Sequence, residues 1–555
     1  MKHRKTIGVG LTALGLLAAT VTGAAAAGQP SGSANGSNSA VVKTDHGLIR
    51  GAVDGQTRTF LGIPYAAPPT KQNDLRWKPP QPAAAWTGVR DATKAGSSCP
   101  QPSGFPMTEQ STSEDCLYLN VTTPASAAGK KLPVLVYLHG GGLAFGAGDL
   151  FGGRSLATRG DVIVVTVNYR LGALGFLDLP ALDARAGSGR SGDFGLEDQQ
   201  AALRWVQRNA AAFGGDAHNV TLAGESAGGM STCAQLASPG AAGLFQRAIV
   251  ESAPCTMPVS GTMYSGPRPR AVAEQQGEAL AVAANCDDAQ HPRPAAQVAD
   301  CLLDLDPSAF AALPGYFGAF GLGPAVGGPV LPIAPDQAIA TGRFNKVPVL
   351  TGTNHDEERF MVNGTLLQGV PLATEADYRA QLAANFCPPG VTSCSTADQV
   401  AARYSASAHD GSYPLALSAT LTDSVFAKPA LDTDQQLARQ VPTYSYEFAD
   451  EQAPGLVGSP DLLPQGAYHT SELGYLFDVT WNTPRDADQD RLSEQMIAYW
   501  SRFIRTGNPN GPGTPRWDRY QGGDFVQSLA PGDGGIHPVD LASEHDYGFW
   551  QNAAK

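Results

Sequence analysis

The sequence of 555 residues lacks several features that would direct its interpretation elsewhere. Its eight cysteines show no C-x-x-C or C-x-x-H spacing, which argues against a structural metal site. Positive charge is scarce, because 38 Lys and Arg stand against 51 Asp and Glu and give a net charge of −13. This balance argues against nucleic acid or an anionic membrane surface as a partner. No internal repeat is visible.

Long apolar runs are also absent, apart from one short run at the N-terminus. Residues 2–5 are basic, residues 7–21 are mainly apolar, and residues 24–27 are alanines that offer an A-x-A cleavage site before Gly28. A membrane anchor would need a longer run with fewer glycines. We therefore expect a signal peptide over residues 1–27, a flexible linker over residues 28–40, a single domain over residues 41–555, and a secreted mature protein.

Secretion permits disulfide bonds, and the number of cysteines is even. Local spacing predicts three disulfides, which are Cys99–Cys116, Cys286–Cys301 and Cys387–Cys394. Cys233 and Cys255 are left over, and they either pair with each other or remain buried thiols.

The hydrophobic pattern predicts an α/β fold with a mainly parallel sheet. Apolar runs at residues 132–138, 162–167, 248–250 and 347–350 are typical of strands in a sheet that is covered on both faces. Residues 444–448 alternate in polarity, which predicts a strand nearer an edge. Helical spacing of apolar residues predicts a helix over residues 196–213. We expect residues 261–328, rich in Pro, Gly and Ala, to form helices and loops over the sheet.

The most informative motif is Gly224-Glu225-Ser226-Ala227-Gly228, a G-x-S-x-G pattern. The preceding residues 219–223 are typical of a buried strand, and the following residues 229–236 are compatible with a helix. A strand, a tight turn and a helix place a serine on a strained elbow with its hydroxyl exposed. We therefore interpret Ser226 as a nucleophile; the alternative is a glycine-rich turn without a chemical role.

A second glycine motif, His139-Gly140-Gly141-Gly142, directly follows the apolar run at residues 132–138. Three glycines allow backbone N–H groups to converge on one point without intervening side chains, as an oxyanion hole requires. We expect the donors to be the N–H groups of Gly141, Gly142 and Ala227. A flexible loop is the alternative interpretation.

A serine nucleophile needs a base, which follows the acid in the chain order of this architecture. Four histidines lie late enough in the chain, namely His409, His469, His537 and His545. His469 lies in a turn after a loop. His537 and His545 lie near the C-terminus, where exposed histidines are expected.

The acid is expected at the C-terminal end of a strand, where ligand crevices form in α/β proteins. The strand expected around residues 347–350 leads into three adjacent carboxylates, which are Asp356, Glu357 and Glu358. Their chemistry alone does not distinguish them.

Further motifs occur in a specific order over most of the chain. They are residues 60–66 (FLGIPYA), 113–121 (SEDCLYLNV), 168–177 (NYRLGALGFL), 194–200 (FGLEDQQ) and 506–509 (TGNP). The set resembles the type-B carboxylesterase/lipase family, which includes cholinesterases and bacterial para-nitrobenzyl esterases. The resemblance implies an α/β-hydrolase fold, with a large, central, mostly parallel twisted sheet, flanking helices, and helix and loop insertions over an active-site gorge.

The resemblance also implies roles for particular residues. The family's acid, the Glu of an Asp-Glu-Gly motif, falls on Glu357, although Glu358 replaces the glycine, and the family's histidine falls on His469. Phe360 falls on an aromatic position that lines the substrate pocket. Family disulfides fall on Cys99–Cys116 and Cys286–Cys301, and structural salt bridges fall on Arg76–Glu114 and Arg170–Asp198.

Choline-specific members carry a tryptophan at the position of Pro106 in this chain, so the cation–π platform for a quaternary ammonium group is missing there. We therefore predict a secreted serine hydrolase of small-molecule carboxylic esters that needs no metal or organic cofactor and has no stable membrane anchor. Its rate should rise through an apparent pKa near about 6.5 to 7 as His469 loses its proton. The alternatives are an interfacial triacylglycerol lipase and a non-catalytic, esterase-like binding or adhesion protein. The oligomeric state stays open.

Overall fold

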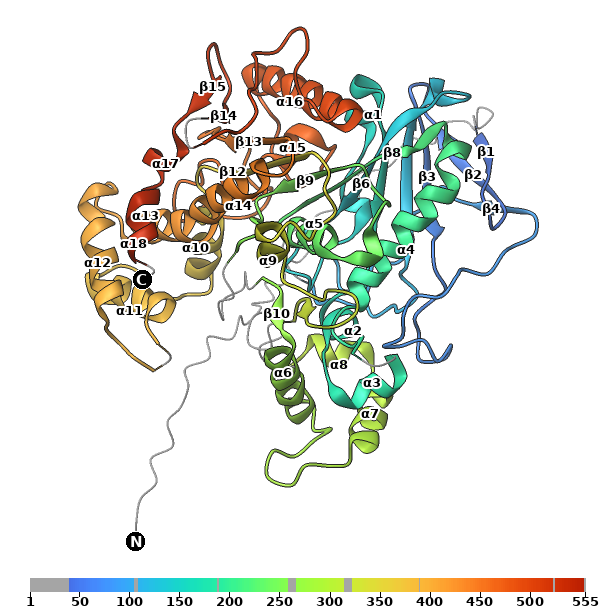
Figure 1. The fold of residues 1–555 in the computed structure, drawn as a ribbon, viewed down its shortest axis with the longest axis horizontal. Helices are drawn as coiled ribbons and strands as arrows, with labels where there is room; N and C mark the ends of the chain where they lie inside the picture. The colour runs from blue at the N-terminus through green and yellow to red at the C-terminus, as the bar shows by residue number, and fades with distance from the viewer. Residues whose placement is uncertain are drawn as a thin grey trace, which may run out of the picture.

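One large twisted sheet runs through the molecule in the computed structural model (Figure 1), which describes residues 39–103, 108–186, 189–257, 266–313, 322–388, 390–522 and 525–553. Within these residues, 13 strands join in the order β1-β2-β3-β5-β7-β6-β8-β9-β12-β13-β14-β15, with β4 beside β2. The seven neighbours from β7 to β14 are parallel to one another, and antiparallel strands extend the sheet at both ends.

The strands have the following bounds: β1 Ser39–Lys43, β2 Leu48–Val53, β3 Thr57–Pro64, β4 Val89–Asp91, β5 Tyr118–Pro124, β6 Leu132–Leu138, β7 Ile163–Val167, β8 Gly215–Glu225, β9 Arg247–Glu251, β12 Val349–Asn354, β13 Thr443–Phe448, β14 Val526–Leu529 and β15 Ile536–Val539. Each of the four apolar runs in the sequence lies on one of the central strands. The residues of these runs that lie on a strand are buried because helices cover both faces of the sheet.

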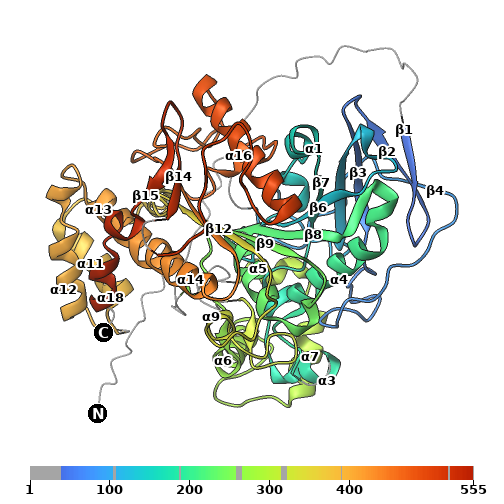
Figure 2. The ribbon, with the colours of Figure 1, turned by 45° about the horizontal axis from the view of Figure 1, so that its top comes forward.

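The two faces of the sheet carry two separate cores, and successive residues of β6 divide between them. Val134 and Val136 pack into the core under α4 (Phe194–Asn209), α5 (Ala227–Ala237) and α14 (Lys428–Ala438). Leu135 and Tyr137 pack into the opposite core, under α1 (Arg154–Gly160), α15 (Leu473–Leu476) and α16 (Ala487–Thr506). Figure 2 shows α1 and α16 on one side of the strands and α4 and α5 on the other. The predicted fold class, an α/β hydrolase, is confirmed.

Strand β13 is third from the β15 end of the sheet, nearer an edge than the strands of the four apolar runs, as its alternation predicts. It pairs with β12 and β14, and all six of its residues are buried. Its alternation reflects two different buried surroundings. Tyr444, Tyr446 and Phe448 belong to the aromatic core under α16. On the other face, Ser445 donates to Asp434 and Glu447 interacts with His545.

Helical insertions extend beyond the sheet at two places (Figure 1). One holds α6 (Arg270–Ala283), α7 (Ala295–Asp304) and α8 (Pro307–Ala311), with the short parallel pair β10 (Arg268–Pro269) and β11 (Ala325–Val326). It packs against α2 (Gly172–Phe176) and α3 (Pro180–Ala186). The other groups α10 (Arg359–Leu367), α11 (Glu375–Phe386), α12 (Ser395–Arg403) and α13 (Tyr413–Leu421) with α18 (Tyr547–Ala553).

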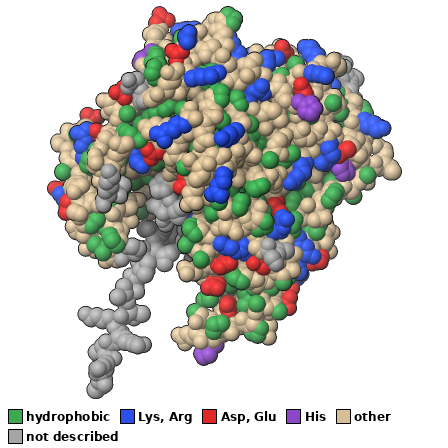
Figure 3. All heavy atoms as spheres, viewed as in Figure 1, with side chains coloured by type: hydrophobic (Ala, Val, Ile, Leu, Met, Phe, Trp, Pro, Cys, Tyr) green, Lys and Arg blue, Asp and Glu red, His purple; other side chains and the backbone are tan. Residues whose placement is uncertain are grey.

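Strand β1 begins at Ser39, so the fold starts two residues inside the range that was expected to be linker. The predicted signal peptide lies outside the described residues. Among the helices of the described ranges, none combines the length and apolarity needed to cross a bilayer. Figure 3 shows hydrophobic side chains interspersed with charged groups of both signs over one face of the molecule.

Four disulfide bonds join segments close in sequence. Three are the pairs that local spacing suggests, Cys99–Cys116, Cys286–Cys301 and Cys387–Cys394. The fourth joins Cys233 on α5 to Cys255 after β9. It connects the helix behind the serine elbow to the neighbouring strand, a pairing that the sequence left open.

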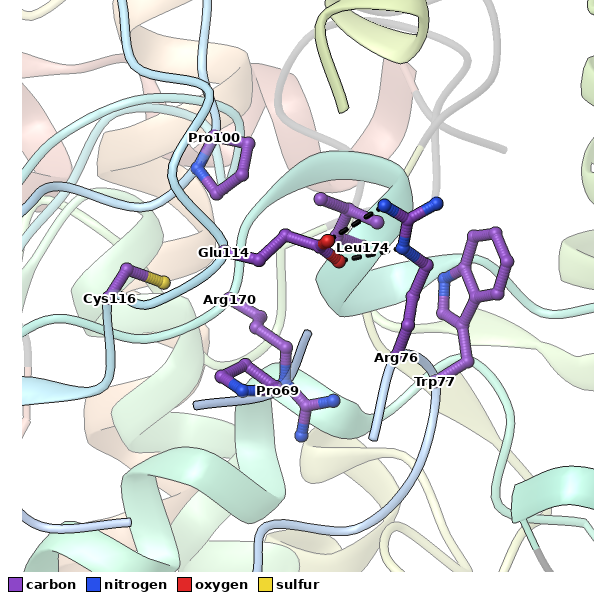
Figure 4. A pocket seen from close by; sticks show the side chains of 8 residues that line it. All are labelled: Pro69, Arg76, Trp77, Pro100, Glu114, Cys116, Arg170 and Leu174. Atoms are coloured by element: carbon purple, nitrogen blue, oxygen red, sulfur yellow. Dashed lines mark hydrogen bonds and ion pairs between the residues drawn. The ribbon is translucent and has the colours of Figure 1, made fainter. Parts of the chain in front are cut away.

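Both expected salt bridges are present and buried. Arg76 donates from Nε and Nη2 to the two carboxylate oxygens of Glu114, each at 2.7 Å (Figure 4). Its Nη1 donates to the carbonyls of Leu303 and Leu305, so the pair also fixes the end of α7. Arg170 makes the same two-pronged contact with Asp198, again at 2.7 Å. Removing one partner would leave an uncompensated buried charge, so we interpret these pairs as structural.

Candidate active site

Ser226 is the single residue that connects β8 to α5, at the carboxyl end of the parallel strands. Its backbone has φ 55° and ψ −124°, a strained conformation for a residue with a side chain. The conformation is held because its N–H donates to the carbonyl of Glu251 at the end of β9, at 2.9 Å. The side chain is half-buried. The sequence therefore forms the strand–elbow–helix unit that its motif predicts.

The two glycines of this motif are required by close packing. A Cβ atom on Gly228 would stand 1.9 Å from the carbonyl oxygen of Leu138, the last residue of β6. A Cβ atom on Gly224 would stand 2.3 Å from the carbonyl carbon of Gly228. Because no side chain fits at either position, α5 can start directly against the ends of β6 and β8.

The loop after β6 brings a second set of backbone groups to the same edge. Gly141 and Gly142 have φ values of 99° and 61°, which favour glycine. Within the described chain, no acceptor is found for their N–H groups. The N–H of Ala227 begins α5 and has no acceptor inside that helix. These three groups are therefore available to bind an oxygen atom.

His139, the first residue of this loop, is held in place by Tyr169. Its ring stacks on Tyr169 at 4.5 Å between centroids, and the Tyr169 hydroxyl donates to the His139 carbonyl at 2.6 Å. Burial lowers the pKa of His139 to about 4, so the ring is neutral near neutral pH. This contact joins Tyr169, the middle residue of the asparagine–tyrosine–arginine motif at residues 168–170, to the glycine loop.

Glu357 is the carboxylate that meets His469. Its Oε2 lies 2.6 Å from Nδ1 of His469, and its backbone carbonyl accepts the N–H of His469 at 3.2 Å. The other oxygen, Oε1, accepts from the Thr353 hydroxyl and the Asn354 N–H, both at 2.8 Å. Both oxygens of this buried acid are thus occupied, which fixes its orientation toward the imidazole.

The two neighbouring acids have other surroundings. Asp356 pairs with Arg359 at 2.8 Å and accepts from the N–H of Ala467 at 3.0 Å. Glu358, which replaces the family's glycine, is 3 % exposed and donates its N–H to the Thr422 hydroxyl at 3.1 Å. Burial raises the pKa of Glu358 to about 8. The structure thus distinguishes three acids that the sequence alone did not.

The other ring nitrogen of His469 faces the serine elbow. Its Nε2 lies 3.2 Å from Oε1 of Glu225, the residue directly before Ser226. Burial lowers the pKa of the imidazole, but the charges of Glu225 and Glu357 more than offset burial and raise it to about 10. The value near 6.5 to 7 expected from the sequence took no account of these two carboxylates, and the pH profile of the enzyme tests it. Burial raises the pKa of Glu225 well above its usual range.

Two more buried acids interact with Glu225. Glu472 accepts from the Asn354 side-chain amide at 2.6 Å, and Glu251 accepts from the Trp500 indole at 2.8 Å. Burial raises the pKa of Glu472 to about 7 and that of Glu251 to about 8. Sequence reasoning missed both acids and Glu225. Two sequence signals could have indicated them. Glu225 occupies the variable position before the serine in G-x-S-x-G, and Glu472 follows His469 by three residues.

Aromatic side chains flank the histidine. The ring of Phe360, at the start of α10, lies 6.4 Å from the His469 ring. The ring of Phe426, on η6 (Thr422–Ala427), lies 5.4 Å from it and was missed by sequence reasoning. Both residues are buried. Pro106, at the position of the choline-binding tryptophan, lies outside the described residues.

The remaining candidate histidines lie elsewhere. His409 follows η5 (Ala406–Ala408) and approaches the Ser405 carbonyl through Nδ1, and His537 is exposed on β15. His545 is 4 % exposed, so the expectation of an exposed C-terminal histidine is wrong for this residue. Within the described chain, His355, Glu447 and His545 form a group whose geometry could hold a metal ion.

Comparisons with known proteins identify the family of the chain. The model of the carboxylesterase family matches residues 38–531. A para-nitrobenzyl esterase of Bacillus subtilis (strain 168) is 35 % identical, covering 86 % of this chain and 92 % of that one. A cocaine esterase of Oryctolagus cuniculus is 34 % identical, covering 87 % and 91 %. The solved structure of a thermophilic para-nitrobenzyl (PNB) esterase superposes with a TM-score of 0.73 at 30 % identity, covering 92 % and 99 %.

These matches extend over nearly the whole described fold, including the serine elbow, the glycine loop and the acid–histidine pair. The chain therefore belongs to the carboxylesterase family and is a carboxylic ester hydrolase.

Proposed function

We propose that the protein is a secreted serine carboxylesterase that works through an acyl-enzyme intermediate, with Ser226, His469 and Glu357 as its catalytic triad. The observation that carries the proposal is the orientation of His469. Its Nδ1 is 2.6 Å from Glu357, while its Nε2 faces Glu225, the neighbour of Ser226. An imidazole held in this way between an acid and a serine elbow is the arrangement of a general base.

In the first half-reaction, Ser226 Oγ attacks the ester carbonyl carbon and passes its proton to His469 Nε2. Glu357 stabilises the imidazolium without taking the proton. The N–H groups of Gly141, Gly142 and Ala227 hold the negative oxygen. His469 then protonates the leaving alcohol, and the acyl group remains on Ser226.

In the second half-reaction, water attacks the acyl-enzyme with His469 again as the base, which releases the carboxylic acid and restores Ser226. These steps use only side chains and backbone N–H groups, so they require no metal or organic cofactor. Relatives named for para-nitrobenzyl esters, cocaine and fumonisin B1 support small-molecule esters as the substrate class. Phe360 and Phe426, beside the imidazole, would contact the apolar part of such a substrate.

Secretion is supported by the basic and apolar N-terminal pattern of the sequence. Four disulfide bonds are consistent with an oxidising compartment. The N-terminal residue of the protein recovered from culture medium tests this part, and a start at or close to Gly28 is the expected result. Retention of the whole protein in the cell would contradict it.

A fluorophosphonate probe tests the nucleophile directly, because it forms a covalent bond only with an activated serine. We expect stoichiometric labelling of wild type, with the adduct located by peptide mass spectrometry on Ser226. Ser231, which is buried on α5 and accepts from the Gln199 side-chain amide at 3.0 Å, provides a matched control as Ser231→Ala and should still be labelled. Absence of labelling, or an adduct on another serine, would refute the proposal and favour a non-catalytic binding protein.

A further inference from the structure

A second cluster of ionisable side chains lies behind the loop that carries Glu357. His355 comes directly after β12, Glu447 is on β13, and His545 follows α17 (Leu541–Glu544). One ligand atom from each residue lies within 4.8 Å of the others. Three segments that are far apart in the sequence therefore bring two imidazoles and a carboxylate to one point.

Further carboxylates support both imidazoles of this cluster. Nδ1 of His545 lies 2.6 Å from Asp423, while its Nε2 lies 2.8 Å from Glu447. Nδ1 of His355 lies 3.2 Å from Asp356. Histidines that bind metals usually hold a carboxylate or carbonyl with the ring nitrogen that does not bind, which fixes the ring and its tautomer. His545 already has this arrangement, with Nε2 turned to Glu447.

A fourth potential ligand stands at the rim of the cluster. Glu544 is exposed at the end of α17, and its carboxyl interacts with that of Glu447 and with both imidazoles. Among the described residues, no lysine or arginine forms an ion pair with Glu447 or Glu544. Two acids thus converge with only histidines as partners, which leaves an excess of negative charge that a cation would neutralise.

We propose that His355, Glu447 and His545 bind one divalent metal ion of the Zn²⁺ class, with Glu544 or water completing the coordination. Two imidazoles and one or two carboxylates are a ligand set that Zn²⁺ accepts in tetrahedral geometry. Binding requires neutral imidazoles, so any proton on His355 or His545 passes to solvent when the metal enters. The side chain of His355 is 38 % exposed, which provides an entry path.

The position of the cluster determines what the metal would do. It would link the loop after β12, strand β13 and the C-terminal segment, and His355 is two residues from Glu357. The metal would therefore hold the acid loop and the C-terminus against the sheet without contacting substrate. The competing arrangement is a metal-free network in which a protonated His545 bridges Asp423 and Glu447.

The test uses the full chain, first stripped with a chelator and then titrated with ZnCl₂ in a calorimeter. We expect about one Zn²⁺ per chain, and a rise in Tm of about 2 °C when free Zn²⁺ reaches 100 times the Kd. Co²⁺ in place of Zn²⁺ should give the visible absorption of a four- or five-coordinate site. Failure to bind one equivalent of either ion would establish the metal-free network and overturn the proposal.

Substitutions locate the site. Glu447→Gln and His355→Asn should each weaken Zn²⁺ binding at least about 100-fold, since each removes a ligand. Glu544→Gln changes a residue at the rim of the cluster and should weaken Zn²⁺ binding about tenfold. Because this variant removes no buried side chain, it keeps the test valid if Glu447→Gln does not fold. His291→Asn is the control, because its side chain is 84 % exposed and stands apart from the cluster. Unchanged binding in His355→Asn and Glu544→Gln would also overturn the proposal.

Discussion

The two halves of the active site are built by different physical means. The nucleophile half, formed by the ends of β6 and β8 and the start of α5, depends on the shape of the backbone. Its glycines allow contacts so close that a Cβ atom on Gly228 would stand 1.9 Å from a carbonyl oxygen. The acid–base half, formed by the loops after β12 and β13, depends on buried charge. There His469 is surrounded by Glu225, Glu357 and Glu472.

The difference predicts different sensitivities. In the nucleophile half, removing a side-chain atom should leave the stability of the fold unchanged, whereas adding one should lower it. In the acid–base half, a substitution that keeps the shape of a side chain should leave activity unchanged unless it removes a charge beside the imidazole. Four substitutions test this contrast, beginning with the largest expected effect.

Ser226→Ala removes one oxygen atom from the elbow. We expect turnover of a para-nitrophenyl ester to fall on the order of a million-fold, because the proposed covalent route is lost. The thermal unfolding midpoint should stay close to that of wild type, since the oxygen has no structural partner in the described chain. Turnover near the wild-type rate would remove Ser226 from the mechanism.

Glu357→Gln keeps the shape of the acid and removes its charge. We expect kcat/KM to fall about 10⁴-fold, because an amide facing Nδ1 favours the wrong imidazole tautomer. Glu251→Gln is the matched control at a second buried acid, which contacts Trp500 and whose pKa, raised by burial to about 8, keeps it mainly protonated at pH 7. It should stay within about threefold of wild type. Equal losses in the two variants would show that general disruption, and not the charge on Glu357, causes the effect.

Gly228→Ala adds one carbon atom where α5 meets β6. We expect a loss of about 3 kcal/mol in the free energy of unfolding, because the helix or strand must move to relieve the overlap. Gly364→Ala on α10 is the control, since nothing lies within 4 Å of its Cβ position, and it should gain up to about 1 kcal/mol from higher helix propensity. Denaturant unfolding measures both. If Gly228→Ala were as stable as wild type, the packing argument for this motif would be wrong.

The pH profile of kcat/KM tests the charges around His469. A raised pKa keeps the imidazole protonated in the free enzyme, so the active base form appears only as pH rises through that value. We therefore expect the rising limb between about pH 8 and 10, well above the usual histidine range. Glu225→Gln removes one supporting carboxyl and should lower the limb by roughly one unit. A limb near pH 6.5 in both proteins would mean that the carboxylates around His469 are protonated at neutral pH.

Much of the fold could be predicted from the sequence because its signals are local. The apolar run at residues 132–138 coincides with β6, and the helix expected over residues 196–213 is α4 followed by the short η3 (Ala210–Phe213). The sequence did not show that residues 444–448 are all buried, because alternation cannot distinguish solvent from a buried polar layer. The burial of His545 was missed for a similar reason, since its partners Asp423 and Glu447 lie 122 and 98 residues away.

The sequence by itself determined the strand–elbow–helix around Ser226, the glycine loop before it and the family of the chain. These features depend on backbone geometry and on residues within a few positions of one another. Only the tertiary structure decided which of three adjacent acids faces His469, which further carboxylates raise its pKa, and how the leftover cysteines pair. Glu357 and His469 are separated by 112 residues, and electrostatic interactions depend on distance in space, which only the packing of the loops after β12 and β13 defines.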